Sequence, residues 1–311
     1  MQVHFGFENA VGIRNPVVTT GSFDGVHIGH KTILNRLNEI AEQIDGESVL
    51  VSFYPHPRKV LYPETQGRDL QFICSQKEKI VLLEKAGLKH LILVRFTLEF
   101  SKTSSEDFIR KLLVGGLNAK YIIVGFNHHF GHNRQGDFSN LYSLSQELDF
   151  GVEEIPEQDI HHETVSSTTI RKALKEGRIQ RANAYLDHQY MIIGALGRGS
   201  NMFSQVGFPT LRVQIEEAGK LIPPTGIYAV TLFWGQCCYK AMAVVSGGCT
   251  AETLQEVNVD VHILNFDGIL HSDEGTLLFQ KAVRFDLNLL DQNILNEQLT
   301  YGLNEVDELI Y

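Results

Sequence analysis

The stretch that decides the fold reads Val17-Val-Thr-Thr-Gly-Ser-Phe-Asp-Gly-Val-His-Ile-Gly-His30. Its apolar and β-branched start predicts a strand that runs to Gly21, and the apolar spacing over Lys31–Ile44 predicts a helix. Gly21 and Gly25 let the backbone turn tightly and approach a ligand without a Cβ clash. A helix that begins near Gly29 would aim free N–H groups and a partial positive charge at an anion. The stretch therefore predicts a phosphate-binding turn.

Two histidines of this turn are candidates for the chemistry. His27 and His30 are separated by only two residues, so both can point at one phosphate chain. There they would donate hydrogen bonds to the charge that builds up on a phosphorus atom under attack. The alternative is a plain strand–helix turn with two exposed histidines. We favour the functional interpretation because the glycines, the strand before them and the helix after them all agree with it.

Strands and helices alternate over the rest of the first half. This βαβ pattern predicts an α/β fold with a doubly wound parallel sheet covered by helices. Ligands of such sheets bind beyond the carboxyl ends of the strands, where Gly21–His30, Phe53–Arg58 and Gly125–Asp137 fall. The expected strands are Ser48–Phe53, His90–Phe96 and Tyr121–Gly125, and the expected helices are Lys77–Ala86 and Ser105–Leu113.

The second half has a different pattern. Two short helices, Ser167–Glu176 and Arg181–Leu186, precede a series of short strands, and a last helix covers Asn293–Ile310. This predicts an antiparallel β-barrel with a C-terminal helix. We expect the boundary near Asp187, which gives domains 1–186 and 187–311. The expected strands are Met191–Ala195, Gly226–Trp234, Cys238–Val245, Val259–Phe266 and Leu277–Phe285.

Composition limits the partners and the compartment. The 311 residues are 43% hydrophobic and 21% charged, as in an ordinary globular protein, and the net charge of −10 argues against nucleic acid and anionic membranes as partners. The four cysteines lack metal-binding spacing, and we find neither a signal peptide nor an apolar run of membrane-spanning length. We expect a cytoplasmic protein and leave its oligomeric state open.

The motifs together resemble those of a known family. Thr20–His30 is similar to the signature of the nucleotidylyltransferase superfamily, and more narrowly to that of the bacterial bifunctional riboflavin kinase/FMN adenylyltransferases, or FAD synthases. The second half resembles the β-barrel of the riboflavin kinase type. Further stretches resemble family motifs in the family's order: Phe53-Tyr-Pro-His-Pro-Arg58, Val124-Gly-Phe-Asn-His-His-Phe-Gly131, Asn133-Arg-Gln-Gly-Asp137, Ser166-Ser-Thr-Thr-Ile-Arg171, Gly207-Phe-Pro-Thr210, Pro224-Thr-Gly-Ile-Tyr228 and Val259-Asp-Val-His-Ile-Leu264.

The resemblance implies an FAD synthase reaction, in which the FMN phosphate attacks the α-phosphorus of Mg-ATP to give FAD and pyrophosphate. His27, His30 and Arg171 are the expected catalytic residues of this half, and the planar guanidinium of Arg171 matches phosphate oxygens. An extended Pro55-His-Pro57 backbone beside Phe53 would form a wall for the flavin ring. The residues expected to bind FMN and ATP are Gly21, Ser22, Phe23, Asp24, Gly29, Phe53, His56, Pro57, Asn127, Ser167 and Thr168.

The second half resembles the riboflavin kinase module but departs from it at several positions. Thr210 keeps the hydroxyl that the family offers to Mg²⁺ and ATP. Arg212 replaces an Asn amide with a guanidinium, which has no acceptor for a metal. Asp260, the expected catalytic base, is one methylene shorter than the family's Glu. The family's loop after the third strand has become Ser246-Gly-Gly-Cys249. We therefore expect weakened conversion of riboflavin to FMN.

Three alternatives stay open at this point. In the first, the chain is a fully bifunctional enzyme. In the second, it is a non-catalytic regulatory protein that binds flavin or nucleotide. In the third, it is a transferase for another phosphorylated acceptor, such as a cytidylyltransferase. Intact His27, His30 and Arg171 argue against the second, and the flavin-site motifs argue against the third. The histidines around His128 and His161 lack zinc spacing, which favours surface or phosphate-contacting roles over a metal site.

Overall fold

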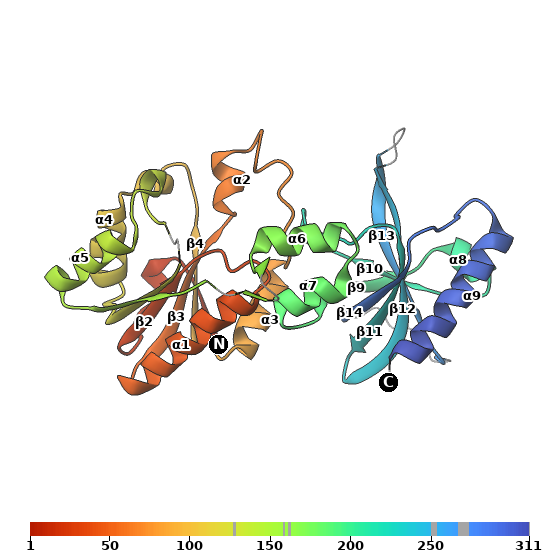
Figure 1. The fold of residues 1–311 in the computed structure, drawn as a ribbon, viewed down its shortest axis with the longest axis horizontal. Coiled ribbons are helices and arrows are strands. Elements are labelled where there is room, and N and C mark those ends of the chain that lie inside the picture. The colour runs from red at the N-terminus through yellow and green to blue at the C-terminus, as the bar shows by residue number, and fades with distance from the viewer. Residues whose placement is uncertain (127–128, 158, 161–162, 250–253, 267–273, 311) are drawn as a thin grey trace. The chain divides into compact units, whose positions relative to one another are not determined.

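The computed structural model describes residues 1–311 except 127–128, 158, 161–162, 250–253, 267–273 and 311 (Figure 1). Internal contacts divide the chain into two compact units. The first comprises Met1–Leu70 and Lys79–Val165, and the second comprises Gln71–Glu78 and Ser166–Tyr311. Among the described helices, none is both long and apolar enough to cross a membrane.

A six-stranded parallel sheet forms the first unit. Its strands are β1 (Gln2–Phe5), β2 (Pro16–Thr20), β3 (Glu47–Tyr54), β4 (His90–Arg95), β5 (Tyr121–Gly125) and β6 (Gly151–Ile155), in the spatial order β1-β4-β3-β2-β5-β6. The central strand β2 is buried along its whole length, as both faces of the sheet are covered. The chain builds β3 and β4 on one side of β2 and then places β5 on the other side. The strand order therefore reverses between β2 and β5.

Helices cover both faces of this sheet, as expected for a doubly wound fold. The helices of this unit are α1 (Ile28–Gln43), α2 (Pro57–Leu61), α3 (Gln76–Lys85), which begins in the second unit, α4 (Ser105–Asp107), the π-helical η3 (Phe108–Val114) and α5 (Phe138–Leu148). On one face, Leu113 of η3 and Leu141 of α5 join an apolar cluster with Val18 and Val49 of the sheet. Helix α1 packs against β2, β3 and β5 through leucines outside that cluster (Figure 1).

The remaining elements of the first unit are short. They are the 3-10 turns η1 (Phe7–Asn9), η2 (Phe100–Lys102) and η4 (His132–Arg134), and the two-residue strands β7 (Asp159–Ile160) and β8 (Glu163–Thr164), which pair with each other.

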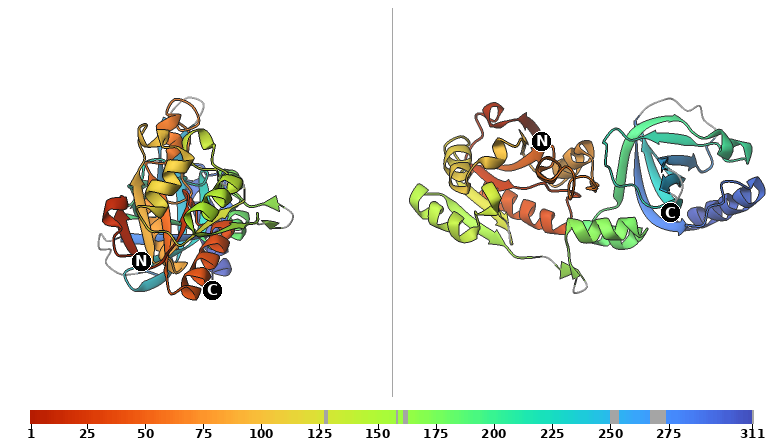
Figure 2. Two further views of the ribbon diagram at one scale, coloured as in Figure 1. Left: turned by 90° about the vertical axis from the view of Figure 1, so that its left-hand side faces the viewer. Right: turned by 90° about the horizontal axis from the view of Figure 1, so that it is seen from above.

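A closed antiparallel barrel dominates the second unit. Its strands are β9 (Tyr190–Arg198), β10 (Leu211–Gln214), β11 (Gly226–Trp234), β12 (Cys237–Cys249), β13 (Leu254–Ile263) and β14 (Glu274–Arg284), in the order β10-β13-β12-β11-β14-β9. The helices of this unit are α6 (Ser167–Lys175), α7 (Ile179–Leu186), α8 (Asn201–Gln205) and the C-terminal α9 (Gln292–Leu309). Helix α9 packs on the outside of the barrel against β11, β12 and β14 (Figure 2). Both the barrel and the C-terminal helix were expected.

The segment Gln71–Glu78 is an integral part of this second unit. The ammonium of Lys220 is buried and donates to the carbonyls of Ile73 and Met191 (2.6 and 2.8 Å) and to the buried carboxylate of Glu78 (2.6 Å). Burial lowers the pKa of Lys220, but the charge and the hydrogen bond of Glu78, together with Tyr190 and Cys74, outweigh it and raise this pKa above its usual value. A buried ion pair thus joins the start of α3 to the segment that connects β10 and β11 of the barrel.

Three sequence expectations need correction. The expected helix Ser105–Leu113 is α4 followed by a π-helical stretch. Pro57, expected in extended backbone, is instead the first residue of α2, a position where the missing N–H of proline costs nothing. Ser246–Cys249, expected as a loop, continues β12, because Gly248 and Cys249 pair with β13 across a bulge.

Candidate active site

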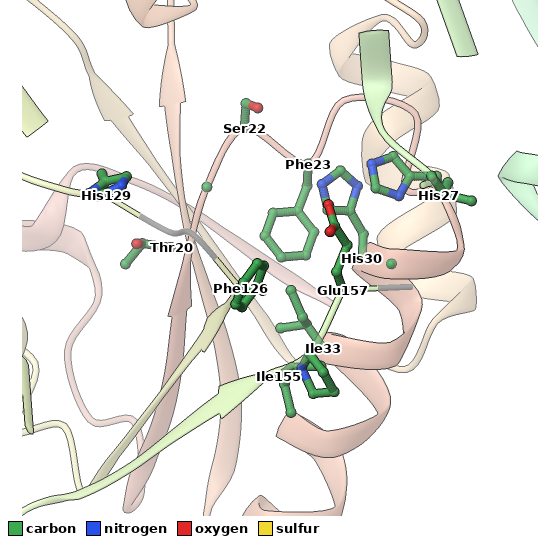
Figure 3. A pocket seen from close by; sticks show the side chains of 15 residues that line it. Thr20, Ser22, Phe23, His27, His30, Ile33, Phe126, His129, Ile155 and Glu157 are labelled. Atoms are coloured by element: carbon green, nitrogen blue, oxygen red, sulfur yellow. The ribbon is translucent and has the colours of Figure 1, made fainter. Parts of the chain in front are cut away.

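A pocket of about 400 Å³ lies at the carboxyl ends of β2, β5 and β6 (Figure 3). This is the point of the sheet where the strand order reverses, and ligands of such sheets bind there. Six of the predicted residues line the pocket: Gly21, Ser22, Phe23, His27, Gly29 and His30. Phe126, His129 and Glu157, from the segments after β5 and β6, line it as well. Asp24 is buried within the turn.

The turn between β2 and α1 has an unusual backbone. Phe23, Gly25 and Val26 adopt φ angles of 47°, 85° and 41°. Left-handed φ values are rare for residues with side chains, above all for a β-branched valine. Phe23 and Val26 are both buried, so their packing holds them in this conformation. Strain of this kind, about 1–3 kcal/mol for each residue, clusters at functional sites.

The two histidines of the turn form a column of rings with Phe23 (Figure 3). The ring centroids of His27 and His30 are 3.7 Å apart, and Phe23 stacks on His30 at 4.4 Å. His27 is only 7% exposed, and its ring packs on that of His30. Burial, His27 and Lys79 together lower the pKa of His30 well below its usual value. His30 is therefore a neutral hydrogen-bond donor at pH 7.

Sequence reasoning missed several residues at or near the pocket, among them Phe126, Glu157 and Lys79. Phe126 lay inside the segment expected to bind ligand, whereas Glu157 follows β6, a strand that was not expected. Lys79 of α3 is buried and donates from Nζ to the Ser22 carbonyl at 3.2 Å. Its position carried a signal, because it precedes the buried Leu83 by one helical turn and so falls on the apolar face of the helix.

The residues predicted to flank the flavin do not line this pocket. Phe53 lies near the end of β3, in an aromatic group with Phe96 and Phe100, both at ring-centroid distances of 5.8 Å. His56 caps α2 by accepting a hydrogen bond from the N–H of Arg58 at 3.1 Å. Pro57 is the first residue of that helix. A role for Phe53, His56 and Pro57 in flavin binding stays a prediction.

The motif Ser166–Arg171 begins α6 and belongs to the second unit. Ser166 caps the helix by accepting the N–H of Thr169 at 3.2 Å, and Ser167 and Thr168 form the first turn. The Nε of Arg171 donates to the Gln71 carbonyl at 2.8 Å. That contact joins Arg171 of α6 to the segment before α3, and a contact of its guanidinium with phosphate stays a prediction.

The kinase candidates lie on the barrel. Arg212 of β10 and Asp260 of β13 are paired across the two strands. The guanidinium Nη2 and Nε donate to the two carboxylate oxygens of the fully buried Asp260, at 2.8 and 3.3 Å. The N–H of Ser200 adds a third contact at 3.1 Å. Thr210 lies nearby in sequence, and its Oγ1 is buried without a hydrogen-bond partner within the described residues. The expected base is thus bound by the arginine.

Some predicted positions lie outside the described residues, among them Asn127, His128, His161 and His162. His132 is described and contacts the Ser101 carbonyl at 2.9 Å through Nδ1. In the part of the chain that the structure describes, no group of three or more His, Cys, Asp or Glu side chains is arranged to hold a metal ion.

Comparison with known proteins covers both halves. Residues 12–169 match the family model for FAD synthetase, and residues 186–310 match the model for riboflavin kinase. Proteins called bifunctional riboflavin kinase/FMN adenylyltransferase from Listeria monocytogenes and Pseudomonas fluorescens are 29% and 30% identical, over 88% and 87% of this chain and 85% of each relative. The protein of that name from Escherichia coli (strain K12) is 28% identical over 91% of both chains.

A solved structure supports the fold. The crystal structure titled macrolide-efflux protein from Streptococcus pneumoniae matches with a TM-score of 0.87 over 99% of both chains, at 23% identity. At that identity the likeness concerns the fold alone. The two family models and the curated relatives go further: this chain belongs to the family of bifunctional riboflavin kinase/FMN adenylyltransferases and is an enzyme with an FAD synthetase domain.

Proposed function

We propose that this enzyme transfers AMP from Mg-ATP to FMN, giving FAD and pyrophosphate. An oxygen of the FMN phosphate attacks the α-phosphorus, and the bond from that phosphorus to the oxygen bridging to the β-phosphate breaks. The FMN phosphate is itself the nucleophile, so no covalent bond to the enzyme forms. Catalysis then rests on alignment and charge neutralisation. Mg²⁺ enters with ATP as part of the substrate.

One observation carries this proposal: the strained turn with its stacked histidines lines a pocket at the switch point of the parallel sheet. Backbone N–H groups of such a turn, together with the start of α1, form a site for phosphate. His27 and His30 would hydrogen-bond the phosphate oxygens. Flavin and nucleotide are the only partners that this reaction needs. We assign it to residues 1–186 and to the cytoplasm.

The test is flavin chromatography after incubation with FMN and Mg-ATP. The parent protein should form FAD, and the pair of substitutions His27→Ala and His30→Ala should abolish it. His132→Ala is the matched control, because His132 is an exposed histidine of the same unit that does not line the pocket. If the control loses activity as fully as the double variant, the proposed role of the pair is wrong.

We propose in addition that the kinase half, residues 187–311, phosphorylates riboflavin weakly. Both oxygens of Asp260, the expected base, accept hydrogen bonds from Arg212, so this carboxylate is poorly placed to take a proton from riboflavin. The orphaned Oγ1 of Thr210 fits a ligand of Mg²⁺, but it supplies one oxygen only. A fully bifunctional enzyme is the second candidate, because the family as a whole carries both activities in its name.

The two candidates differ in the rate at which riboflavin becomes FMN. We expect Arg212→Asn combined with Asp260→Glu to raise that rate, because the amide restores an oxygen for the metal and the longer side chain restores the base. Arg212→Asn alone should lower the melting temperature, since it leaves a fully buried carboxylate without its cation. If the unmodified protein makes FMN from riboflavin as fast as it makes FAD, the proposed impairment is wrong.

A further inference from the structure

Lys79 is a buried cation that the proposed reaction does not yet use. It lies on α3 in the first unit and is 7% exposed. A buried ammonium group costs several kcal/mol unless nearby groups compensate it. The neighbouring Lys77 and Lys85 of the same helix are exposed, so burial of Lys79 is not a general property of lysines on this helix.

The contacts of Lys79 lead to the phosphate-binding turn. Its Nζ donates to the carbonyl of Ser22 at 3.2 Å and lies 3.5 Å from the hydroxyl of Ser52 in β3. Ser22 lines the pocket and directly precedes Phe23, the first residue of the turn with a left-handed φ. Because a trans peptide is planar, its C=O and N–H point in opposite directions. With the Ser22 carbonyl held by Lys79, the N–H of Phe23 points away from the lysine.

The charge of Lys79 also reaches the pocket. It is one of the groups that lower the pKa of His30, after burial and the neighbouring His27. A positive charge felt by His30 in the pocket wall acts on an anion in that pocket too. Two independent observations, the hydrogen bond to the turn and this electrostatic effect, therefore connect Lys79 to the site.

We infer that Lys79 is a positioning residue for the nucleoside triphosphate: it fixes the Ser22–Phe23 peptide so that the Phe23 N–H is presented to a phosphate, and it places a permanent positive charge behind the turn. The inference deepens the proposed function and rests on it. If Lys79 served stability alone, Lys79→Met would lower the melting temperature. If Lys79 is a positioning residue, the melting temperature should stay the same or rise, because replacing a buried charge by a hydrophobic side chain of similar size is often neutral or stabilising.

The test compares the parent with Lys79→Met, Lys79→Gln and Lys79→Arg, and uses Lys85→Met as the matched control on the same helix. FAD formation is measured at saturating FMN with varied Mg-ATP, and melting temperature is measured alongside. We expect Lys79→Met to fold and to lose about 100-fold in kcat/KM for ATP, the scale of losing one preorganised donor. Gln keeps a donor without the charge, so it should lose less, and Arg should lose least. Lys85→Met should match the parent.

A pH measurement separates positioning from mere packing. Among the described residues, His27 and Lys79 act on the pKa of His30, and the titratable His129 and Glu157 line the same pocket. Loss of the Lys79 charge raises the pKa of His30 in the free enzyme. The pH range in which Mg-ATP binding takes up a proton should therefore move upward in Lys79→Met and Lys79→Gln, but not in Lys79→Arg.

Failure of the inference and failure of the proposed function give different results. If the parent makes FAD and Lys79→Met stays within about twofold of its kcat/KM, the inference is wrong and the proposed function stands. If the parent makes no FAD, the proposed function is wrong, and calorimetric binding of Mg-ATP to the same variants decides the inference. Should Lys79→Met fail to fold, Lys79→Gln is judged by the same two measurements.

Discussion

Val26 and Phe23 show at the scale of single residues how the turn between β2 and α1 is built. Both hold left-handed φ angles without being glycine, and both are buried. The backbone strain is thus stabilised by apolar packing, which leaves the peptide groups of the turn in a fixed orientation before a ligand arrives. Preorganised donors cost no reorganisation when charge develops in the transition state.

His30 gives a prediction about protons. Its pKa in the free enzyme lies well below the ordinary value of histidine, owing to burial, His27 and Lys79. A bound triphosphate adds negative charge and raises that pKa. At a pH between the pKa of His30 in the free enzyme and its pKa in the complex, Mg-ATP binding therefore takes up a proton. The affinity for Mg-ATP should therefore increase as the pH falls below neutral into that range.

Calorimetry in two buffers of different ionisation enthalpy measures this uptake directly. In a series of pH values below neutral, the observed binding enthalpy should depend on the buffer for the parent and for His132→Gln, and much less for His30→Gln. Equal enthalpies in both buffers for the parent protein would refute the proton uptake.

Helix α3 shows what a single element adds. Ser75 and Glu78 form a capping box at its start: the Ser75 N–H donates to Oε2 of Glu78 at 2.7 Å, and the Glu78 N–H donates to the Ser75 hydroxyl at 3.2 Å. The same carboxylate accepts the N–H of Ile193 at 2.9 Å and the ammonium of Lys220 at 2.6 Å. Glu78 therefore anchors the helix start and neutralises a buried cation at once.

Glu78→Gln should destabilise the barrel strongly. Breaking a buried pair leaves Lys220 charged and unpaired, at a cost of about 3–5 kcal/mol. The matched control is Lys77→Gln on the same helix, which removes an exposed ion pair with Glu274 and should cost less than about 1 kcal/mol. Urea unfolding followed by the fluorescence of Trp234, the single tryptophan and a residue of β11, measures both. Equal midpoints for Glu78→Gln and Lys77→Gln would contradict the account.

The sequence predicted most elements because their signals are local. The turn from Gly21 to His30 carries its glycines, histidines and flanking periodicities within one short stretch, and the structure has it between β2 and α1. Strands β1 and β10, of four residues each, were not expected because short runs give little periodicity to read. The contacts of Lys79 with Ser22 and of Lys220 with Glu78 depend on residues 57 and 142 positions apart, which no local pattern encodes.

The same limit applies to the kinase residues. The sequence placed Arg212 and Asp260 as separate departures from the resembled motif. The structure adds that they are cross-strand neighbours and bind each other. Two substitutions that look independent along the chain are one ion pair, so a change at either position acts on both.

At the scale of the whole molecule, the two family matches divide the chain at other residues than the two compact units do. The match to the FAD synthetase model spans residues 12–169, yet residues 71–78 within it belong to the barrel unit. We predict that a fragment of residues 187–311 lacks a cooperative thermal transition, because Lys220 loses Glu78 and its other partner from this segment, Ile73. Lys220→Met in the fragment should restore part of the stability by removing the unpaired charge. A fragment that melts like the full chain would show that the segment is dispensable.

The fate of each phosphorus of ATP distinguishes adenylyl transfer from any other reaction of this enzyme with ATP. Full-length protein is incubated with FMN and Mg²⁺, in parallel with ATP labelled at the α-phosphorus and ATP labelled at the γ-phosphorus, and the products are separated by chromatography. Adenylyl transfer predicts that the α label appears in FAD and the γ label in pyrophosphate. Folded protein that leaves the flavin without α label would contradict the assignment.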